Sequence, residues 1–219
     1  MSCWSAENAK RAYLQALRMG ERGKEPDVAE FLSALAAGKN AKLIVVACAG
    51  IAGPTTLALA AAAHQTGGRV VCICCGQNEV QASKKALAGA YGDSVELVVG
   101  DVETRLLNED YKGADFVLVD CDIANAKEIL LVALKEAKKK EGALVVGYNV
   151  RRRVSCWRQL KTASFLPIGE GLLVVSSNKH GRVEHRKKKS HWIVKVDKYT
   201  GEEHIFRVTS PYNKMHIKA

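Results

Sequence analysis

Short apolar runs recur along the first two thirds of the chain, and each is followed by a turn of small or polar residues. The runs are continuous rather than alternating, which is typical of strands buried on both faces of a parallel sheet. Helical patterns separate them, as in βαβ units, so we expect an α/β fold with a mostly parallel sheet. The predicted strands are Leu43–Val46, Arg69–Cys75, Val95–Val99, Phe116–Asp120 and Ala143–Tyr148.

Two helices are expected before the first strand. Ser5 is placed as the N-cap of a helix that runs to Met19, and Pro26 begins a second helix with one apolar face, closed by Gly38. These leading helices are expected to cover a sheet edge, a ligand crevice or the same helices of a second copy in a homodimer. The later helices are expected at Thr55–Ala63, Asn78–Ala90, Ala124–Lys140 and around Ser155–Lys161.

The pattern changes after Asn149, where short strands follow one another closely. Ser164–Ile168 and Leu172–Ser176 are joined by a tight turn, so they must pair antiparallel. Trp192–Val196 and His204–Val208 form a second predicted hairpin. The expected organisation is N-terminal helices in residues 1–40, an α/β core in residues 41–178 and a hairpin extension in residues 179–219.

The first predicted strand leads into a glycine turn and then a helix. Gly50 and Gly53 break the chain, and Pro54 suits the first position of the following helix. In doubly wound domains this unit presents unpaired helix N–H groups to a ligand beyond the end of the strand. The alternative is a tight turn that binds nothing.

Charge is unevenly spread along the chain. The net charge is +10, and residues 179–219 hold 11 Lys and Arg against 4 Asp and Glu. This favours an anionic partner such as RNA, DNA, acidic lipid or a phosphorylated ligand; a solvated basic tail is the alternative. The residues expected to bind nucleic acid are Arg182, Arg186, Lys187, Lys188 and Lys189.

Location can be inferred only from what the sequence does not contain. It has no run of about 18 apolar residues, which a membrane span needs, and the first residues lack the apolar core of a secretion signal. We therefore expect a cytoplasmic protein. The basic segment Gly181–Lys189 is a nuclear-localisation signal, a nucleic-acid-binding patch or a flexible loop, so a nuclear protein is the alternative.

Seven cysteines, an odd number, predict mostly reduced thiols. Cys48, Cys74, Cys75 and Cys121 fall at the ends of predicted strands. One hypothesis is a metal or redox site at the mouth of the sheet; the other is that these residues are small apolar fillers. The six histidines match no zinc pattern.

Several motifs, in order and at suitable spacing, resemble those of class I S-adenosylmethionine-dependent methyltransferases, above all the small-molecule O-methyltransferases. The matching segments are ACAGIAGPTTLALAAA, VELVVGD, FVLVDCD, GALVVGYNV and the closing SFLPIGEGLLVVSS. The resemblance implies a Rossmann-like fold with a seven-stranded sheet ending in an antiparallel hairpin. It assigns cofactor binding to Ala49, Gly50, Gly53, Cys74, Asp101, Asp120 and Asp122, with Asp101 at the adenine.

The chain departs from that family at positions that carry chemistry. Ala47 stands where the family has an acid near the end of strand one, and Ala49 stands where it has the first motif glycine. Ile123 stands where it has a Lys after strand four. Cys74 stands where the family has the acid that binds the ribose hydroxyls, and Tyr148 stands where it has a metal-binding Asp. With Asn149 and Asp120 remaining, too few hard oxygen ligands are left for Mg²⁺ or Ca²⁺. We expect weak S-adenosylmethionine binding, strengthened by Cys74→Glu, and no metal.

The segments MSCWSAENAKRAYL and EPDVAEFLSALAAG also resemble an uncharacterised plant family, catalogued as a domain of unknown function and grouped with methyltransferase-like folds. Two functions follow from these resemblances. The first is a methyltransferase-like protein with altered cofactor and metal motifs and an unassigned acceptor. The alternative is a non-catalytic module that binds nucleic acid or protein on the same fold. No catalytic residue is assigned.

Overall fold

The computed structural model describes residues 4–19, 28–89, 91–107, 111–137, 142–150, 163–176, 190–196 and 203–209. The chain divides into two compact units, Met1–Lys179 and His180–Ala219. Each unit is described by itself. Among the helices in these ranges, none is long and apolar enough to cross a membrane.

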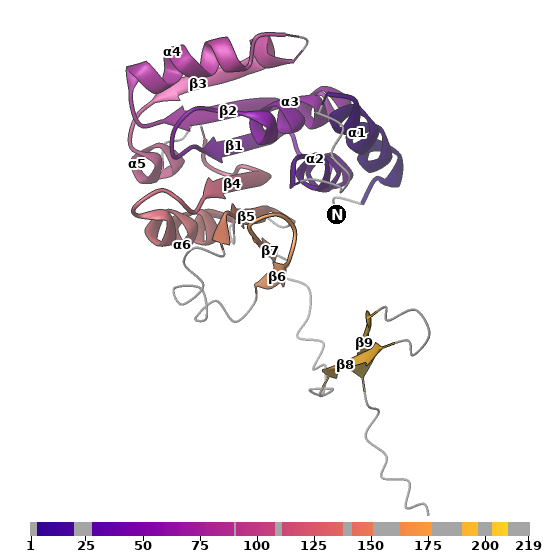
Figure 1. Ribbon diagram of the computed structural model, residues 1–219. Helices are drawn as coiled ribbons and strands as arrows, with labels where there is room; N and C mark the ends of the chain where they lie inside the picture. Colours follow the sequence, from indigo (N-terminus) through magenta and orange to yellow (C-terminus); the bar gives the residue numbers. More distant parts are fainter. Residues whose placement is uncertain are drawn as a thin grey trace, which may run out of the picture. The chain divides into compact units, whose positions relative to one another are not determined.

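A seven-stranded sheet forms the centre of the first unit (Figure 1), in the order β3-β2-β1-β4-β5-β7-β6. The first five strands in this order are parallel, and β7 runs antiparallel between β5 and β6. The mostly parallel sheet with a final antiparallel hairpin is therefore confirmed. The strands are β1 (Leu43–Ala47), β2 (Arg69–Cys74), β3 (Val95–Val99), β4 (Phe116–Asp120), β5 (Leu144–Tyr148), β6 (Ser164–Leu166) and β7 (Leu172–Ser176).

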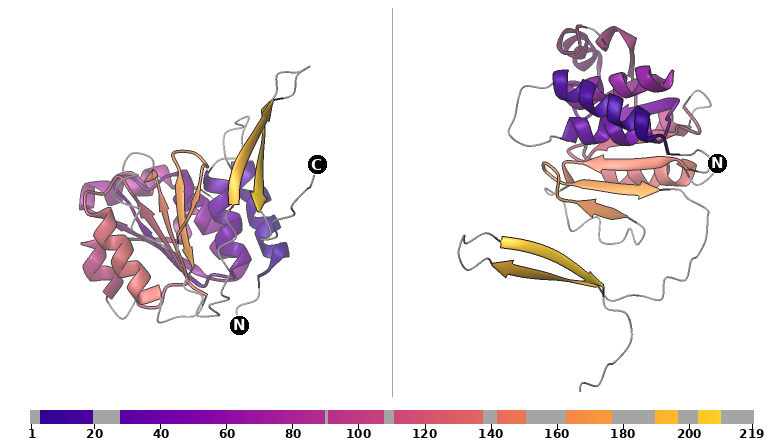
Figure 2. Two further views of the ribbon diagram at one scale, coloured as in Figure 1. Left: turned by 90° about the horizontal axis from the view of Figure 1, so that it is seen from below. Right: turned by 90° about the vertical axis from the view of Figure 1, so that its right-hand side faces the viewer.

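Helices cover both faces of the sheet because its central strands are apolar on both sides. Ile44 and Val46 of β1 pack in a core with side chains from α1 to α4, whereas Val45 and Ala47 pack in a second core with α5 and α6. Alternate residues of a strand point to opposite faces, which explains this division. The left view of Figure 2 shows helix α6 and the N-terminal helices on opposite sides of the strands. The helices are α1 (Ala6–Met19), α2 (Val28–Gly38), α3 (Pro54–Thr66), α4 (Gln77–Ala86), α5 (Val102–Leu107) and α6 (Ala126–Ala137).

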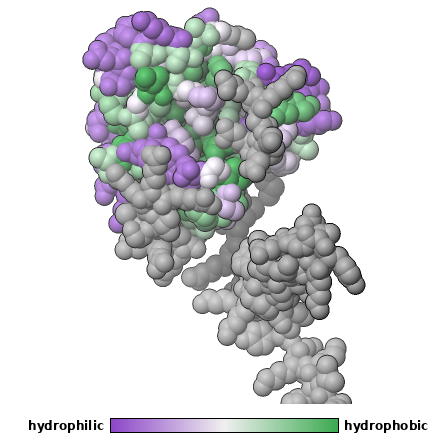
Figure 3. Space-filling view, viewed as in Figure 1, coloured by the Kyte–Doolittle hydropathy of each residue, from purple (hydrophilic) through white to green (hydrophobic). Residues whose placement is uncertain are grey.

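Helix α5 is the element that the pattern of apolar residues does not predict. It has six residues, and it begins directly after Asp101. Helix α4 ends at Ala86, earlier than the predicted Ala90, and a 3₁₀ turn over Gly92–Ser94 precedes β3. The outer face of α4 is hydrophilic in Figure 3, as expected from its Gln, Asn, Glu and Lys residues. The predicted helix around Ser155–Lys161 lies outside the described residues.

The second unit holds the predicted second hairpin. Strands β8 (Ser190–Val196) and β9 (Glu203–Thr209) pair antiparallel, with Ser190 opposite Thr209 and Val196 opposite Glu203. The residues expected to bind nucleic acid between positions 182 and 189 lie outside the described residues. Their role stays a prediction, as does a homodimer through α1 and α2.

Candidate functional site

At the carboxyl edge of the parallel strands, the connections that follow the neighbouring strands β1 and β4 go to opposite faces of the sheet. The chain leaves β1 into α3 on one face of the sheet and leaves β4 through a short loop into α6 on the other face. This reversal is the topological switch point at which open α/β sheets bind ligands. Four features lie at or near this edge: a glycine turn, a carboxylate cluster, an apolar cleft and a group of thiols.

The glycine turn joins β1 to α3. Ala49 and Gly50 are half-buried, and Gly53 is the N-cap of α3 in an extended conformation with Pro54 next. A Cβ placed on Gly50 or Gly53 would meet no atom within 4 Å, and neither residue has a left-handed backbone. The turn is anchored at Ala52, whose N–H donates to Ser83 Oγ at 2.9 Å. Within the protein itself, therefore, neither backbone conformation nor packing requires glycine at these two positions.

A carboxylate cluster ends strands β4 and β5. Asp120 is buried, and its carboxylate accepts hydrogen bonds from the Tyr148 hydroxyl at 2.9 Å, from Asn149 Nδ2 at 3.0 Å and from the Asp122 N–H at 3.0 Å. Asn149 Nδ2 also lies 3.4 Å from Asp122 Oδ2. Asn149 has a left-handed backbone, with φ of 60°, which is uncommon outside glycine. The amide of Asn149 thus stands between the two carboxylates.

Tyr148 is the central donor of this cluster. Burial, and next the negative charge of Asp120, raise the pKa of the Tyr148 hydroxyl. The hydroxyl therefore keeps its proton at neutral pH and donates a hydrogen bond to Asp120.

The donor set does not fit a hard cation. Mg²⁺ and Ca²⁺ need oxygen ligands with free lone pairs, whereas here an O–H and an amide N–H point at the Asp120 oxygens. Across the described ranges, no group of three or more His, Cys, Asp or Glu side chains could hold a metal ion. Tyr148, where the sequence resemblance implied a metal-binding Asp, is a hydrogen-bond donor to Asp120.

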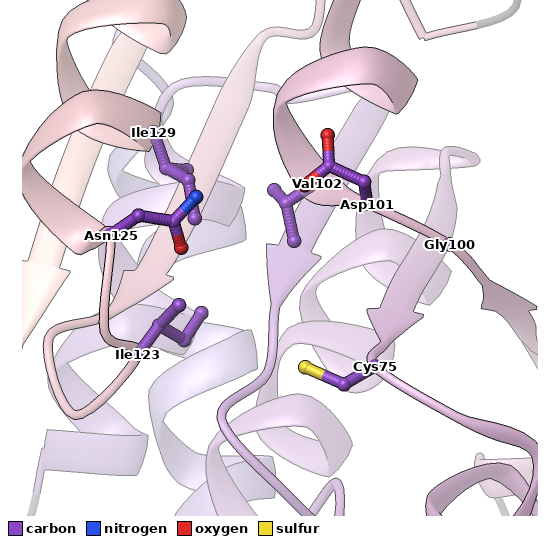
Figure 4. Close-up of a pocket in the computed structure, with 7 residues that line it drawn as sticks. All are labelled: Cys75, Gly100, Asp101, Val102, Ile123, Asn125 and Ile129. Atoms are coloured by element: carbon purple, nitrogen blue, oxygen red, sulfur yellow. The ribbon is translucent and has the colours of Figure 1, made fainter.

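An apolar cleft of about 270 Å³ lies beside the ends of β2, β3 and β4 (Figure 4). Val102, Ile123 and Ile129 are almost completely buried and belong to the core on the α5–α6 face. This volume is slightly below the range of about 300–1,000 Å³ found for small-molecule sites, so the cleft holds part of a ligand. Apolar walls of this size suit a planar ring better than an extended ligand. The cleft is lined by Cys75, Gly100, Asp101, Val102, Ile123, Asn125 and Ile129.

Asn125 is the polar side chain that bridges this cleft to α5. Its Nδ2 donates to Glu103 Oε1 at 2.8 Å. Its backbone carbonyl accepts from the Ile129 N–H at 3.1 Å, which fixes Asn125 at the start of α6. In Figure 4 the oxygen of the Asn125 amide lies on the side of Ile123, opposite the nitrogen.

Asp101 lines the cleft, but its carboxylate accepts hydrogen bonds from the first turn of α5. Oδ2 accepts from the Thr104 N–H and from Thr104 Oγ1, both at 2.8 Å, so Asp101 is the N-cap of this helix. The bond from the Thr104 N–H lowers the pKa of the Asp101 carboxyl. The oxygen that makes these bonds therefore faces the first turn of α5.

The thiols are divided between the two faces of the sheet. Cys48, Cys72 and Cys74 belong to the core under α3 and α4, whereas Cys121 belongs to the core under α6. Cys48 and Cys121 therefore pack on opposite faces of the sheet and do not share one site. Cys75 is exposed at the cleft, where its Sγ lies 3.9 Å from the Cys48 carbonyl.

Hydrogen bonds link the three thiols on the α3–α4 face. Cys48 and Cys74 lie beside the Cys72 thiol, whose single proton can be donated to only one of them at a time, and hydrogen bonding to them raises the pKa of Cys72. Hydrogen bonding from Cys72 lowers the pKa of Cys48, and for Cys74 it lowers the pKa to about 7. The Cys74 side chain is fully buried, with Sγ 4.0 Å from Ser83 Oγ. It therefore faces the underside of α4 and not the cleft.

The predicted cofactor residues thus come together only in part. Gly50, Gly53, Asp120 and Asp122 lie at the carboxyl edge of the sheet, and Asp101 lies at the cleft with its carboxylate turned to α5. The sequence did not predict a cofactor-binding role for four residues that line the cleft, Cys75, Val102, Asn125 and Ile129. Only Cys75 had a signal in the sequence, because it directly follows the second strand, at the edge where ligands bind.

The sheet order, the helix layers and the glycine turn at the switch point define the class I methyltransferase fold. The family model described as "Protein of unknown function (DUF1442)" matches residues 1–208, and the chain belongs to that family. No curated protein matches the sequence.

Solved structures share the fold at low identity. Cofactor-bound Rv0187 from MTB is 23% identical, with a TM-score of 0.56 over 79% of this chain and 91% of that chain. An O-methyltransferase from Bacillus cereus in complex with SAH is 20% identical, with a TM-score of 0.56 over 78% and 91%. The O-methyltransferase TomG from Streptomyces achromogenes, in complex with SAM, is 22% identical, with a TM-score of 0.55 over 78% and 89%.

Proposed function

We propose that this protein binds S-adenosylmethionine or S-adenosylhomocysteine weakly at the carboxyl edge of its sheet, without a metal ion, as a methyltransferase-like protein of altered chemistry. The observation that carries the proposal is the open space over Gly50 and Gly53. Glycine is retained where a ligand approaches the backbone closely. The solved structures with bound SAM or SAH support this choice of ligand.

The residues at the edge fit this cofactor incompletely. The turn at Gly50 and the N-terminus of α3 suit its amino-acid end, and the apolar cleft suits a base. No carboxylate from the end of β2 is offered to the ribose hydroxyls, because Cys74 is buried toward α4 and the next residue, Cys75, presents a thiol to the cleft. Each such charge-assisted bond contributes about 1.5–3 kcal/mol. Its loss weakens binding by about tenfold or more.

The carboxylate cluster supports a site without a metal. Asp120 receives three hydrogen bonds from neutral donors, Tyr148, Asn149 and the N–H of Asp122. Placing a cation against it would require the hydroxyl and the amide to turn away. If methyl transfer occurs, the acceptor is therefore positioned by hydrogen bonds and not by chelation.

Gly50→Val tests the proposal, because a side chain there enters the ligand space without meeting protein atoms. Calorimetric titration of the wild type with both cofactors should give weak binding that is lost in Gly50→Val at unchanged thermal stability. Ala88→Val is the matched control, since Ala88 is exposed beyond the end of α4. Absence of binding in the wild type, or equal binding by Gly50→Val, would contradict the proposal.

The basic extension supports a second function, the binding of nucleic acid by residues 179–219. The observation that favours it is the concentration there of 11 of the 33 basic residues with only 4 of the 23 acidic ones. Contacts between Lys or Arg and phosphate lose affinity steeply with salt. Replacing Arg186, Lys187, Lys188 and Lys189 by Gln in the full chain should lower RNA or DNA affinity and flatten its dependence on salt. Equal affinity and slope would reject this function.

A further inference from the structure

The cleft residues Asn125 and Glu103 form a pair with a fixed direction. Asn125 lies at the start of α6 and Glu103 lies in α5, and the bond between them is 2.8 Å long. A carboxylate can only accept hydrogen bonds. Asn125 must therefore turn its NH₂ group to Glu103, and its carbonyl oxygen, Oδ1, must face the other way. This orientation follows from the chemistry of Glu103 and not from an arbitrary choice of amide rotamer.

The oxygen of Asn125 is then offered to a cleft whose walls are apolar. It lies on the side of Ile123 in Figure 4, and Val102 and Ile129 complete the walls. The carboxylate that the sequence assigns to this place, Asp101, is bonded through Oδ2 to Thr104. An oriented acceptor beside apolar walls is complementary to a flat ring that carries an amino group.

We infer that Asn125 determines base specificity in this cleft by accepting a hydrogen bond from the exocyclic amino group of adenine, and that Glu103 acts as a positioning residue for it. The inference rests on the proposed function, because adenine is the base of both cofactors named there. Adenine presents an amino group at its six-position. Hypoxanthine, which differs at that position, presents a carbonyl oxygen that would face Asn125 Oδ1 without a proton between them.

Adenosine and inosine are the probes that separate these cases. A site built to accept from an amino group disfavours the analogue that lacks it, because the acceptor, here the half-buried Asn125, is left unpaired when the ring covers it. We expect the wild type to bind adenosine at least about tenfold more tightly than inosine, a difference of about 1.4 kcal/mol. Ligand-observed NMR titration of the full chain measures both affinities.

Glu103→Gln tests the positioning role with little change of shape. A glutamine can donate as well as accept, so it allows the Asn125 amide to turn its nitrogen toward the cleft. In Glu103→Gln, inosine binding should strengthen and adenosine binding should weaken. The ratio of adenosine affinity to inosine affinity should then fall to about twofold. A residue with only a structural role would weaken both nucleosides alike. Asn125→Ala should remove the preference, and Glu128→Gln, an exposed change on α6, should leave it intact.

The outcomes separate this inference from the proposed function. Equal affinity for the two nucleosides, no binding of adenosine, or an unchanged preference in Glu103→Gln would overturn the inference. If S-adenosylhomocysteine still binds in those cases, the proposed function stands without it. Preference for adenosine together with no binding of either cofactor would support the base site and reject the proposed function.

Discussion

The Tyr148 hydroxyl donates a hydrogen bond of 2.9 Å to Oδ2 of Asp120, across the ends of two neighbouring parallel strands. Asp120 is buried, so this bond matters more than an exposed one would. The hydroxyl supplies a neutral donor at the position for which the resemblance to O-methyltransferases implied a metal-binding Asp. The end of strand β4 is therefore held by a hydrogen bond from strand β5.

Tyr148→Phe removes this donor and leaves the ring in place. Asp120 keeps its bonds from Asn149 and from the N–H of Asp122, but one oxygen loses its partner. Leaving a buried acceptor unpaired costs about 1–3 kcal/mol. Urea unfolding should show a loss in the free energy of unfolding of this size. Tyr13→Phe on α1 is the control, and an equal loss in both variants would show that the bond to Asp120 is not responsible.

The same hydroxyl gives the stability a dependence on alkaline pH. Burial raises the pKa of Tyr148 in the folded protein above the value of about 10 in the unfolded chain. Its contribution is complete below about pH 10 and is lost as the pH rises toward the folded value. The wild type should therefore lose more stability than Tyr148→Phe between about pH 9 and about pH 11. Parallel curves for the two proteins would contradict this assignment.

An acid at position 148 should create a cation site. The melting temperature of the wild type should not respond to Mg²⁺, Ca²⁺ or a chelator, since donors face Asp120. Tyr148→Asp adds carboxylate oxygens beside Asp120 and Asn149, so its melting temperature should rise on adding either cation. A ligand at 100 times its Kd stabilises by about 2.7 kcal/mol. Tyr148→Asn is the control without the charge, and a response of the wild type would refute the idea.

The sequence predicts the sheet well because buried parallel strands leave continuous apolar runs between turns. It misses α5 because Val102–Leu107 is too short to show a helical period. The pair of Asn125 and Glu103 also has no local signature, since 22 positions separate the two residues and the bond joins α5 to the residue just before α6. Which face Cys48 and Cys121 would occupy could not be predicted, because both follow the last residue of a strand.

Asp101 should affect the stability of α5 more than the binding of adenosine. Its carboxylate accepts from the Thr104 N–H, and removing such a cap destabilises by about 0.5–2 kcal/mol. Asp101→Ala should show this loss in urea unfolding, while Asp101→Ser, which can still cap, should lose less. Because the pKa of Asp101 is lowered, its contribution is present above about pH 4 and is lost as the pH falls through the folded value.

Adenosine affinity should change less than about twofold in either Asp101 variant, on the scale where tenfold is about 1.4 kcal/mol. A loss of affinity in Asp101→Ser, with stability kept, would instead return the base contact to Asp101. NMR titration on the same samples used for unfolding separates the two roles.

Cys74→Glu is the substitution for which the structure most changes the expectation from sequence. The sequence predicts stronger cofactor binding, because a carboxylate at the end of strand two would accept from the ribose hydroxyls. The side chain of Cys74 is fully buried against Ser83 and the Cys72 thiol, on the face away from the cleft. A carboxylate there would be buried without a charged partner, which destabilises by about 3–5 kcal/mol. We now expect Cys74→Glu to lower the free energy of unfolding without a gain in affinity.

Cys75→Glu is the variant that should gain affinity instead. Cys75 follows β2, is exposed and lines the cleft, so a carboxylate there stays hydrated and can reach a ribose beside the base. One added charge-assisted bond of about 1.5 kcal/mol strengthens binding about tenfold. Calorimetric titration of both variants with S-adenosylhomocysteine, alongside urea unfolding, decides between the two positions. Tighter binding by a stable Cys74→Glu would show that its side chain turns out of the core toward the cofactor. A gain confined to Cys75→Glu would place the ribose at the cleft.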